Sequence, residues 1–312
     1  MLTRPPLLTR FLNYYTLLAA CLLILAYNVW TFRDSDFQFV KHAPIKQEPK
    51  TIPKKLWYKL GPHGMNDQIR GWTDSCIKDN PDYQVEFMTD ESGDEFVKKA
   101  FAWRPDIVEG YLGLTVPILK ADLLRYLLLF DQGGIWSDLD ITCRGPPMDQ
   151  WVPEEYKESA DLVVGWEFDY GWPGKFIRQF ASWTIMAKKG SPHLMQVIDD
   201  IFDTLHAKLE ENHVSVENAT LQIIGDVVDF SGPRRLTYGI YRSLSKQLNR
   251  TVEEQDFARI LQPKMLGSVL VMPGHSFAAS SNTYTPEESE HLPPQLVEHH
   301  YAGTWKNDHG GE

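Results

Sequence analysis

The segment from 120 to 140, KADLLRYLLLFDQGGIWSDLD, constrains the fold of this chain more than any other. It predicts a nearly apolar helix, a double glycine, and a short strand that ends in two aspartates separated by a leucine. Side chains on a strand alternate between its faces, so Asp138 and Asp140 should point the same way while Leu139 points into the sheet. Such a pair at the carboxyl end of a strand, where open α/β sheets bind ligands, can hold a divalent cation and thereby phosphates.

The helix before this aspartate pair carries Asp122 and Arg125, three residues apart and therefore on one face of an otherwise apolar run. We expect both side chains to leave the core together. Gly133 is placed to close the helix with a left-handed backbone, and Gly134 to allow a tight turn into the strand. This turn should bring all four charged side chains to one cleft. The alternative without a ligand site is a helical ion pair followed by two solvated aspartates.

This order of residues resembles the sugar-nucleotide region of the retaining family 32 glycosyltransferases, and the large clostridial glucosylating toxins share it. The resemblance implies four catalytic residues: Asp122 and Arg125 would contact the donor sugar and diphosphate, Asp138 ribose or metal-bound water, and Asp140 the metal. Trp136 departs from the family pattern, in which tyrosine is usual. A bare D-x-D is a weak signal, but the upstream D-x-x-R and the double glycine make it specific.

Other segments show the same resemblance. Residues 51–60, TIPKKLWYKL, resemble the I-P-K-x-x-W opening of the family and predict a first strand. Trp57 is a candidate donor-binding residue that could stack on a base, and it could equally belong to the core. Residues 80–90 predict a turn and a second strand. Residues 229–233, DFSGP, resemble a T-G-P turn before a helix, and a plain helix start and an acceptor-site role both remain open.

The C-terminal segment 298–306, EHHYAGTWK, resembles the family's closing H-x-x-G-S-W and the H-x-x-G-x-x-K of related retaining transferases. By this resemblance His300 joins the aspartate pair as a metal ligand, and Lys306 contacts the diphosphate. Carboxylates with an imidazole favour Mn²⁺ over Mg²⁺. Since adjacent positions on a strand face opposite ways, His299 is the alternative ligand. The alternative interpretation of this segment is a solvated tail without a role in the site.

Residues 11–32 form a run of 22 residues without a charge. At ~1.5 Å per residue, this run can cross a hydrocarbon core about 30 Å thick. Arginines precede it and aspartates follow, so the positive-inside rule predicts a type II anchor with residues 1–10 in the cytosol. Residues 33–50 then form a stem and residues 51–312 a lumenal domain. A cleaved signal peptide is the alternative.

A lumenal location makes the sequons at Asn218 and Asn249 candidate glycosylation sites. Cys21 lies in the predicted anchor. Cys76 and Cys143 could form a disulfide in an oxidising lumen or remain two small buried side chains, and we favour the second because nothing in their spacing demands a bridge.

Composition restricts the partners and the architecture. With 31 basic and 42 acidic residues the net charge is −11 and no basic patch stands out, which argues against nucleic acid. Strands alternating with helices predict an α/β fold, a mixed sheet covered on both faces, which the resemblance identifies as the nucleotide-diphospho-sugar transferase A type (GT-A). Strands are expected at 161–167, 180–188 and 269–272, one helix from Pro192 with Ser191 as its N-cap, and another after Pro233.

Three tryptophans and a glutamate beyond the aspartate pair could line an acceptor groove, since sugars stack on aromatic faces. The candidates are Trp166, Glu167, Trp172 and Trp183. Core packing is the favoured role of Trp166 and Trp183, because large apolar side chains are usually buried.

These observations predict a metal-dependent retaining glycosyltransferase of the Golgi membrane, most similar to the fungal initiation-type α-1,6-mannosyltransferases of family 32 over residues 51–306. The resemblance implies GDP-mannose as donor and a mannose hydroxyl of a glycoprotein N-glycan as acceptor. Alternatives are another hexose donor or an inositol phosphoceramide acceptor. A non-catalytic subunit of a Golgi transferase complex is the alternative from another class.

Overall fold

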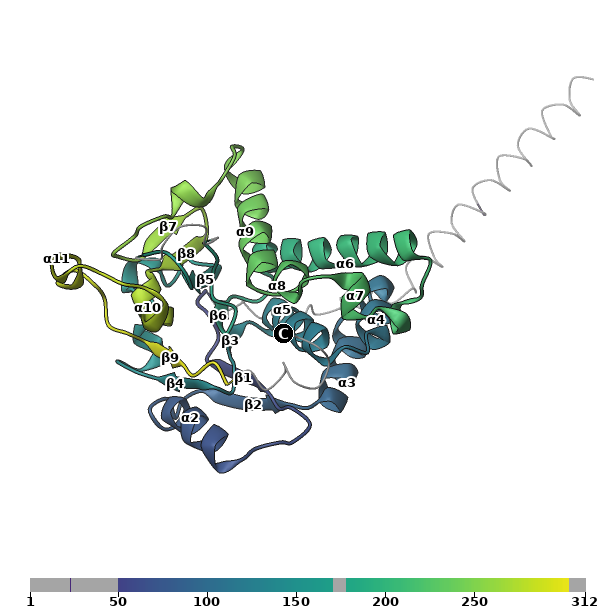
Figure 1. The fold of residues 1–312 in the computed structure, drawn as a ribbon, viewed down its shortest axis with the longest axis horizontal. Coiled ribbons are helices and arrows are strands. Elements are labelled where there is room, and N and C mark those ends of the chain that lie inside the picture. The colour runs from purple at the N-terminus through teal and green to yellow at the C-terminus, as the bar shows by residue number, and fades with distance from the viewer. Residues whose placement is uncertain (1–22, 24–49, 171–177, 303–312) are drawn as a thin grey trace, which may run out of the picture. The chain divides into compact units, whose positions relative to one another are not determined.

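The computed structural model describes residues 50–170 and 178–302, together with Leu23 (Figure 1). The predicted anchor at 11–32, the cytosolic tail before it and nearly all of the stem therefore lie outside the described residues. Within the described part of the chain, no helix has the length and apolarity needed to cross a membrane.

The central element is a seven-stranded mixed sheet with the order β2-β1-β3-β6-β5-β8-β7. Strands β1, β2, β3, β5 and β8 run parallel to one another, and β6 and β7 run against them. The predicted mixed α/β sheet is thus confirmed. The strand bounds are β1 (Lys55–Lys59), β2 (Gln84–Met88), β3 (Gly134–Ser137), β5 (Leu162–Gly165), β6 (Thr184–Ala187), β7 (Lys264–Leu266) and β8 (Val269–Met272).

Helices cover both faces of this sheet (Figure 1), because successive strand side chains alternate between two apolar clusters. Leu162 and Val164 of β5 enter one cluster, and Val163 between them enters the other. The first cluster is completed by α3 (Asp90–Ala100), α4 (Pro105–Gly113), α5 (Pro117–Gln132), α6 (Pro192–Asn212) and α9 (Pro233–Leu248). The second is completed by α2 (Asp67–Lys78), α10 (Gly274–Ala278) and Trp151.

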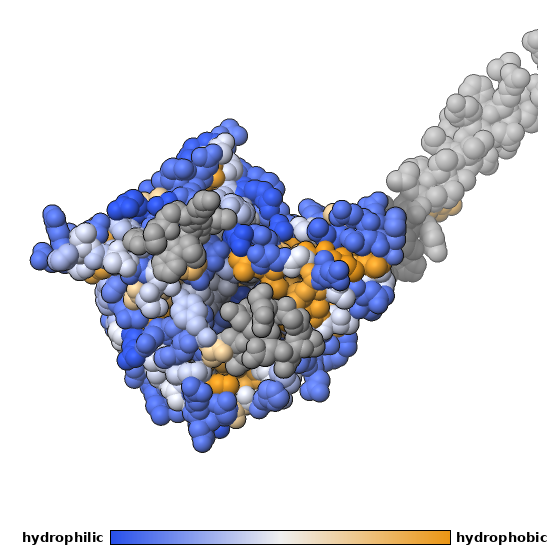
Figure 2. Space-filling view, viewed as in Figure 1, coloured by the Kyte–Doolittle hydropathy of each residue, from blue (hydrophilic) through white to orange (hydrophobic). Residues whose placement is uncertain are grey.

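Three short helices complete the described part: α7 (Leu221–Ile224), α8 (Val227–Phe230) and α11 (Pro286–Ser289). Apolar side chains gather at the surface around α7, whereas most of the remaining surface in this view is hydrophilic (Figure 2). The predicted helix starts are confirmed: α6 begins at Pro192 and α9 at Pro233. Ser191 occupies the N-cap position of α6, but its side chain makes no capping hydrogen bond.

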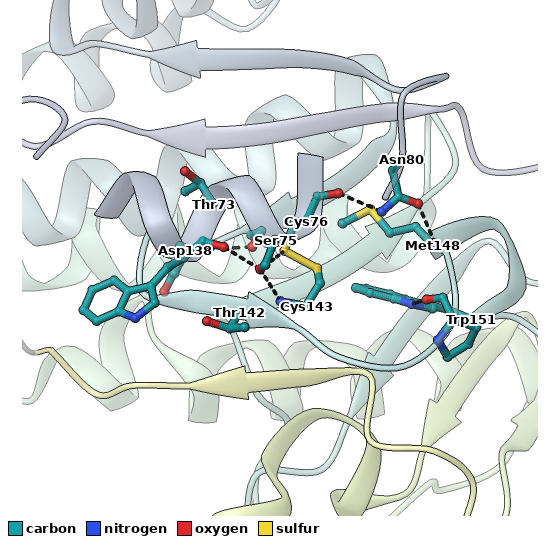
Figure 3. Close-up of a disulfide and its surroundings, with 12 residues drawn as sticks. Thr73, Ser75, Cys76, Asn80, Asp138, Thr142, Cys143, Met148 and Trp151 are labelled. Atoms are coloured by element: carbon teal, nitrogen blue, oxygen red, sulfur yellow. Dashed lines mark hydrogen bonds between the residues drawn. A yellow bond between two sulfur atoms is a disulfide. The ribbon is translucent and has the colours of Figure 1, made fainter. Parts of the chain in front are cut away.

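A second, two-stranded sheet pairs β4 (Ile141–Cys143) with β9 (Val297–His299). A disulfide between Cys76 of α2 and Cys143 ties this small sheet to the helix (Figure 3). Our expectation of two unbridged cysteines is therefore wrong. The two residues are 67 positions apart in sequence, so the sequence did not predict that they are neighbours. The packing of α2 on β4 brings their Cα atoms to 4.9 Å. Ser75 Oγ accepts a hydrogen bond from the Cys143 N–H at 2.9 Å and strengthens the junction.

Strand β1 lies between β2 on one side and β3 on the other, so the order of the strands reverses at β1 and β3. Open α/β sheets bind ligands in the crevice outside the carboxyl ends of strands at such a switch point. The aspartate pair follows the carboxyl end of β3. The topology thus places it where a nucleotide ligand is expected.

The double glycine permits β3 to start directly after α5. Gly133 and Gly134 have φ angles of 65° and 106°, which confirms the predicted use of glycine at this turn. A Cβ atom on Gly134 would lie 2.7 Å from the Lys55 carbonyl oxygen of β1. Neither the backbone conformation nor the space therefore accepts a side chain.

Replacing Gly134 with alanine should lower the free energy of unfolding by roughly 2 kcal/mol or more, through backbone strain and overpacking against β1. Gly71→Ala is the matched control, because Gly71 lies within α2 with nothing near its Cβ position. That change should be neutral or stabilise the fold by up to about 1 kcal/mol. Urea unfolding followed by tryptophan fluorescence measures both, and equal stability of the two variants would contradict this account of the turn.

Candidate active site

Arg125 is the centre of the site, on the face of α5 that meets the end of β3. Its Nη1 donates to Asp122 Oδ1 at 2.8 Å, and its Nη2 donates to Asp138 Oδ1 at 3.2 Å. Asp122 and Arg125 are each only 4% exposed. Our expectation that they leave the core was wrong, because the carboxylates neutralise the guanidinium inside the protein. Asp138 and Asp122 raise the pKa of Arg125 although burial works in the opposite direction.

The aspartate pair lies in a turn and not on a strand. Strand β3 ends at Ser137 and β4 begins at Ile141, so Asp138 and Asp140 occupy the intervening turn. The two carboxylates still lie close enough to interact electrostatically, as predicted. The indole N–H of Trp136 donates to Asp138 Oδ1 at 2.6 Å. Tryptophan at this position therefore supplies a polar contact to the site.

The C-terminal segment reaches the site through the pairing of β9 with β4. His299 Nε2 lies 3.2 Å from Asp140 Oδ2, and the ring stacks on Trp183 with 4.2 Å between the ring centroids. The other ring nitrogen, Nδ1, is buried without a hydrogen-bond partner among the described residues. The backbone N–H of Ala302 also donates to Asp140 Oδ2, at 2.9 Å. Asp140 thus fixes the end of the described chain over the turn.

His300 faces away from the aspartates. Its ring stacks on Trp72 at 4.6 Å, and its Nε2 forms a hydrogen bond with the Thr142 hydroxyl at 2.7 Å. Neighbouring positions on a strand face opposite ways, and the register of β9 selects His299 for the site. We therefore transfer the predicted metal-ligand role from His300 to His299.

The electrostatics of the turn suit a cation. Burial raises the pKa of Asp138, although Arg125 opposes this shift, and the charge of Asp140 adds to it. Burial also opposes ionisation of Asp140, but hydrogen bonds from His299 and Ala302 hold its pKa below the usual range. A single guanidinium therefore faces three carboxylates, the third being Asp122. These four side chains together carry an excess of negative charge.

Ser231 is a site residue that the sequence did not single out. Its hydroxyl donates to Asp122 Oδ2 at 2.8 Å, and its carbonyl accepts from the Tyr126 hydroxyl at 2.8 Å. Ser231 lies in the DFSGP turn, which does begin helix α9, and it is fully buried. The turn is thus a helix start that also holds Asp122 in place. The likeness to a T-G-P turn was the only signal that pointed to this position.

Glu167 follows β5 at the same edge of the sheet and is 7% exposed. Gln179 Nε2 donates to its Oε2 at 2.8 Å. Burial raises the pKa of Glu167 to about 7, and His299 is near enough to counteract part of this shift. The site therefore has a second carboxylate-bearing region besides the aspartate turn.

The sequence of this chain is similar to those of known proteins. Residues 66–158 match the family described as glycosyltransferase sugar-binding region containing DXD motif. The chain is 30% identical over 294 residues to an initiation-specific alpha-1,6-mannosyltransferase of Candida albicans, an alignment that covers 84% of this chain and 74% of that protein. The chain belongs to the DXD-motif glycosyltransferase family.

Two further relatives extend the comparison. The transferase is 29% identical over 265 residues to an initiation-specific alpha-1,6-mannosyltransferase of Schizosaccharomyces pombe, which covers 82% of this chain and 64% of that protein. It is 30% identical over 113 residues to a mannosyl phosphorylinositol ceramide synthase of Saccharomyces cerevisiae, which covers 36% of this chain and 29% of that protein. The chain thus spans less than two thirds of each of these two relatives.

The donor atoms fit the divalent metal that DXD-motif glycosyltransferases generally use. Among the residues that the structure describes, no group of three or more His, Cys, Asp and Glu side chains is arranged to hold a metal ion. Two carboxylates with one imidazole nevertheless suit an ion that completes its shell with water and donor phosphates. The excess negative charge of the turn and the position of His299 Nε2, 3.2 Å from Asp140 Oδ2, agree with this chemistry.

The remaining predicted residues have different outcomes. Trp57 is 6% exposed and its indole N–H donates to the Gly133 carbonyl at 2.9 Å, so it belongs to the core and is not free to stack on a base. Trp166 and Trp183 are buried, as we favoured. Lys306 lies outside the described residues, as does Trp172. The sequon asparagines Asn218 and Asn249 are both exposed, and their glycosylation stays a prediction.

If the imidazole of His299 contributes to metal binding, His299→Ala should raise the Mn²⁺ concentration required for half-maximal donor hydrolysis by roughly tenfold or more, the scale for loss of a metal-supporting group. His300→Ala is the neighbouring control and should leave that concentration within about threefold of the wild type, because its ring contacts Trp72 and Thr142. A Mn²⁺ titration of the two variants checks this assignment. A shift in His300→Ala alone would restore the original choice of ligand.

Proposed function

We propose that the chain is a metal-dependent retaining mannosyltransferase, which moves mannose from GDP-mannose to a mannose hydroxyl of a glycoprotein N-glycan and forms an α-1,6 linkage. The observation that carries this proposal is the buried Arg125 held between Asp122 and Asp138, beside Asp140, at the switch point of the sheet. The two initiation-specific α-1,6-mannosyltransferases, similar over most of this chain, support the choice of sugar. The mixed sheet agrees with the GT-A fold that we propose.

The described residues can perform two tasks in this reaction. Arg125 presents a fixed guanidinium toward the turn, where it would stabilise charge that develops on the departing diphosphate. Asp122, oriented by Ser231, would hold both Arg125 and the donor sugar. Asp138, Asp140 and His299 would hold the cation, for which we propose Mn²⁺. The cation supplies further neutralisation of the diphosphate when bound.

We propose that the transfer proceeds without a covalent nucleophile, for which the sequence gives no evidence. Retention of configuration at the donor carbon is compatible with attack by the acceptor hydroxyl from the face that the diphosphate leaves. We propose Lys306 as a further diphosphate contact on the strength of the sequence resemblance alone.

A donor-hydrolysis screen tests this proposal and its site together. The chain should hydrolyse GDP-mannose with Mn²⁺ faster than UDP-galactose, UDP-glucose or UDP-N-acetylglucosamine. Asp140→Asn keeps the shape of the side chain but removes a charge, so hydrolysis should fall at least ~100-fold, the scale for loss of one electrostatic stabiliser. Asp82→Asn is the control, since Asp82 is a highly exposed surface aspartate whose ion-pair partner among the described residues is Lys54.

The outcomes separate the parts of the proposal. Faster hydrolysis of a UDP-sugar would contradict the choice of mannose and leave the site intact. Near-normal hydrolysis by folded Asp140→Asn would contradict the site. A chain that hydrolyses none of the donors while it still binds Mn²⁺ would favour the non-catalytic subunit of a Golgi complex.

The partial similarity to a mannosyl phosphorylinositol ceramide synthase favours one alternative acceptor, inositol phosphoceramide. This similarity covers 36% of the chain, whereas the similarity to the initiation-specific α-1,6-mannosyltransferase of Candida albicans covers 84%. We therefore prefer the N-glycan. Transfer of labelled mannose to each acceptor in parallel decides between them.

We propose that the transferase is a single-pass type II protein of the Golgi membrane, on the support of the uncharged run at 11–32 and the arginines before it. The chain should resist carbonate extraction from microsomes and carry glycans at Asn218 or Asn249, which endoglycosidase treatment would remove. Asn218→Gln with Asn249→Gln is the control that should abolish the shift. A soluble product that starts after about residue 33 would contradict the anchor.

A further inference from the structure

The edge of the sheet that carries the aspartate turn continues past it to a second polar position. Strands β3 and β5 are both antiparallel to β6, so their carboxyl ends open at the same edge. Glu167 follows β5, two strands away from the turn that follows β3. At ~4.8 Å per strand, the two strand ends lie roughly 10 Å apart. The aspartate turn and Glu167 are therefore separate positions at one end of the sheet.

Trp183 links the two positions. It precedes β6, which lies between β3 and β5, and its carbonyl accepts from the Asp138 N–H at 2.9 Å. Its buried ring stacks on His299 and meets Tyr301 edge-on, with 5.7 Å between the centroids. Asp138, Trp183 and Glu167 therefore form a row at the ends of the neighbouring strands β3, β6 and β5.

Tyr301 is held over this row with an exposed ring. Its side chain is anchored by a 2.7 Å hydrogen bond between its hydroxyl and that of Ser281, and its ring packs on His299 at 4.0 Å. The residue as a whole nevertheless stays 48% exposed. Its φ of 48° is unusual for a bulky side chain, and such conformations persist where the surroundings impose them, often at ligand sites. A fixed aromatic face open to solvent is a stacking platform.

Glu167 supplies the polar counterpart. This carboxylate is buried, yet it forms no ion pair with any residue that the structure describes, and Gln179 is its hydrogen-bond donor. Burying a carboxyl group without a cation is costly, so such groups cluster at functional sites. Hydroxyl groups of a ligand could donate to it without bringing another charge into the site.

We propose that Glu167 and Tyr301 form the subsite for the acceptor sugar. A neutral hexopyranoside stacks on the exposed face of Tyr301, and its hydroxyls donate hydrogen bonds to the carboxyl group of Glu167. The position over β6 and β5 favours an acceptor over the nucleotide base, which the switch point places on the opposite side, at β1 and β3. This inference rests on the proposed function, which identifies the bound sugar as the acceptor.

Binding of α-linked mannobiose to the full chain, measured by saturation-transfer NMR and titration, tests the subsite without any turnover. Tyr301→Ala should weaken mannobiose binding by about tenfold or more through loss of the stacking surface. Tyr301→Phe keeps the ring and should retain most of the affinity. Tyr238→Ala is the matched control, because Tyr238 on α9 is also 48% exposed and lies outside the row.

Glu167→Gln keeps the shape of the side chain and an oxygen that can accept from Gln179, so the fold should be retained. Loss of a hydrogen bond to the carboxyl group should weaken mannobiose binding about tenfold. In the transfer reaction, both Glu167→Gln and Tyr301→Ala should raise the acceptor KM by more than the donor KM. A purely structural role would change both constants alike.

Each result bears on a different claim. Binding by Tyr301→Ala and Glu167→Gln equal to that of the wild type would overturn the subsite. Hydrolysis of GDP-mannose by a wild type that does not bind mannobiose would overturn the subsite while it supports the donor half of the proposed function. Tyr301-dependent binding by a chain that does not use GDP-mannose would support the subsite and contradict the proposed donor.

Discussion

The buried ion pairs of Arg125 are the interaction on which the rest of the site depends. Removing a guanidinium and two carboxylates from water is expensive, and a buried ion pair adds little stability compared with an apolar replacement. The surrounding leucines of α5 would be the simpler way to fill this space. We therefore explain the arrangement by the proposed ligand: Asp122, Ser231 and Asp138 fix the guanidinium of Arg125 in place before the proposed diphosphate binds.

The second requirement is that a distant part of the chain must close over this centre. The disulfide ties β4 to α2, the pairing of β4 with β9 sets the register of the C-terminal segment, and that register turns His299 toward Asp140. A shift by one residue would exchange His299 with His300, because strand neighbours face opposite ways. The cross-link thus contributes to the position of a side chain that lies more than one hundred residues further along the sequence.

Local sequence patterns predicted many of the helices and strands. Apolar periodicity, prolines at helix starts and the double glycine predicted α5, α6, α9 and the strand before the aspartates, because each depends on neighbouring residues. The spacing of Asp122, Arg125 and Asp138 likewise predicted their proximity. Contacts between elements that are distant in sequence could not be predicted from such local patterns. The partner of Cys76, the choice between His299 and His300, and the contact of Ser231 with Asp122 depend on how separate elements dock.

Burial was the other quantity that the pattern did not predict. Charged residues in an apolar helix were expected to reach solvent, and Trp57 was a candidate to stack on a base. The structure buries Arg125 because two carboxylates on different elements converge on it, and it buries Trp57 because the indole finds the Gly133 carbonyl. Both outcomes follow from hydrogen-bond partners supplied by tertiary structure, which a single sequence window does not contain.

Asp140 joins the two halves of the site. Its carboxylate accepts from the Ala302 N–H and contacts His299, and its carbonyl accepts from the His300 N–H at 3.0 Å. The same aspartate thus orders the segment that presents Tyr301 and belongs to the turn where the donor is expected. Coupling between two binding events is reciprocal. If a ligand at the turn stabilises the segment that carries Tyr301, the ordered segment must stabilise binding of that ligand by the same free energy. We therefore expect donor binding at the turn and the shape of the proposed acceptor subsite to be linked through Asp140 as well as through Trp183.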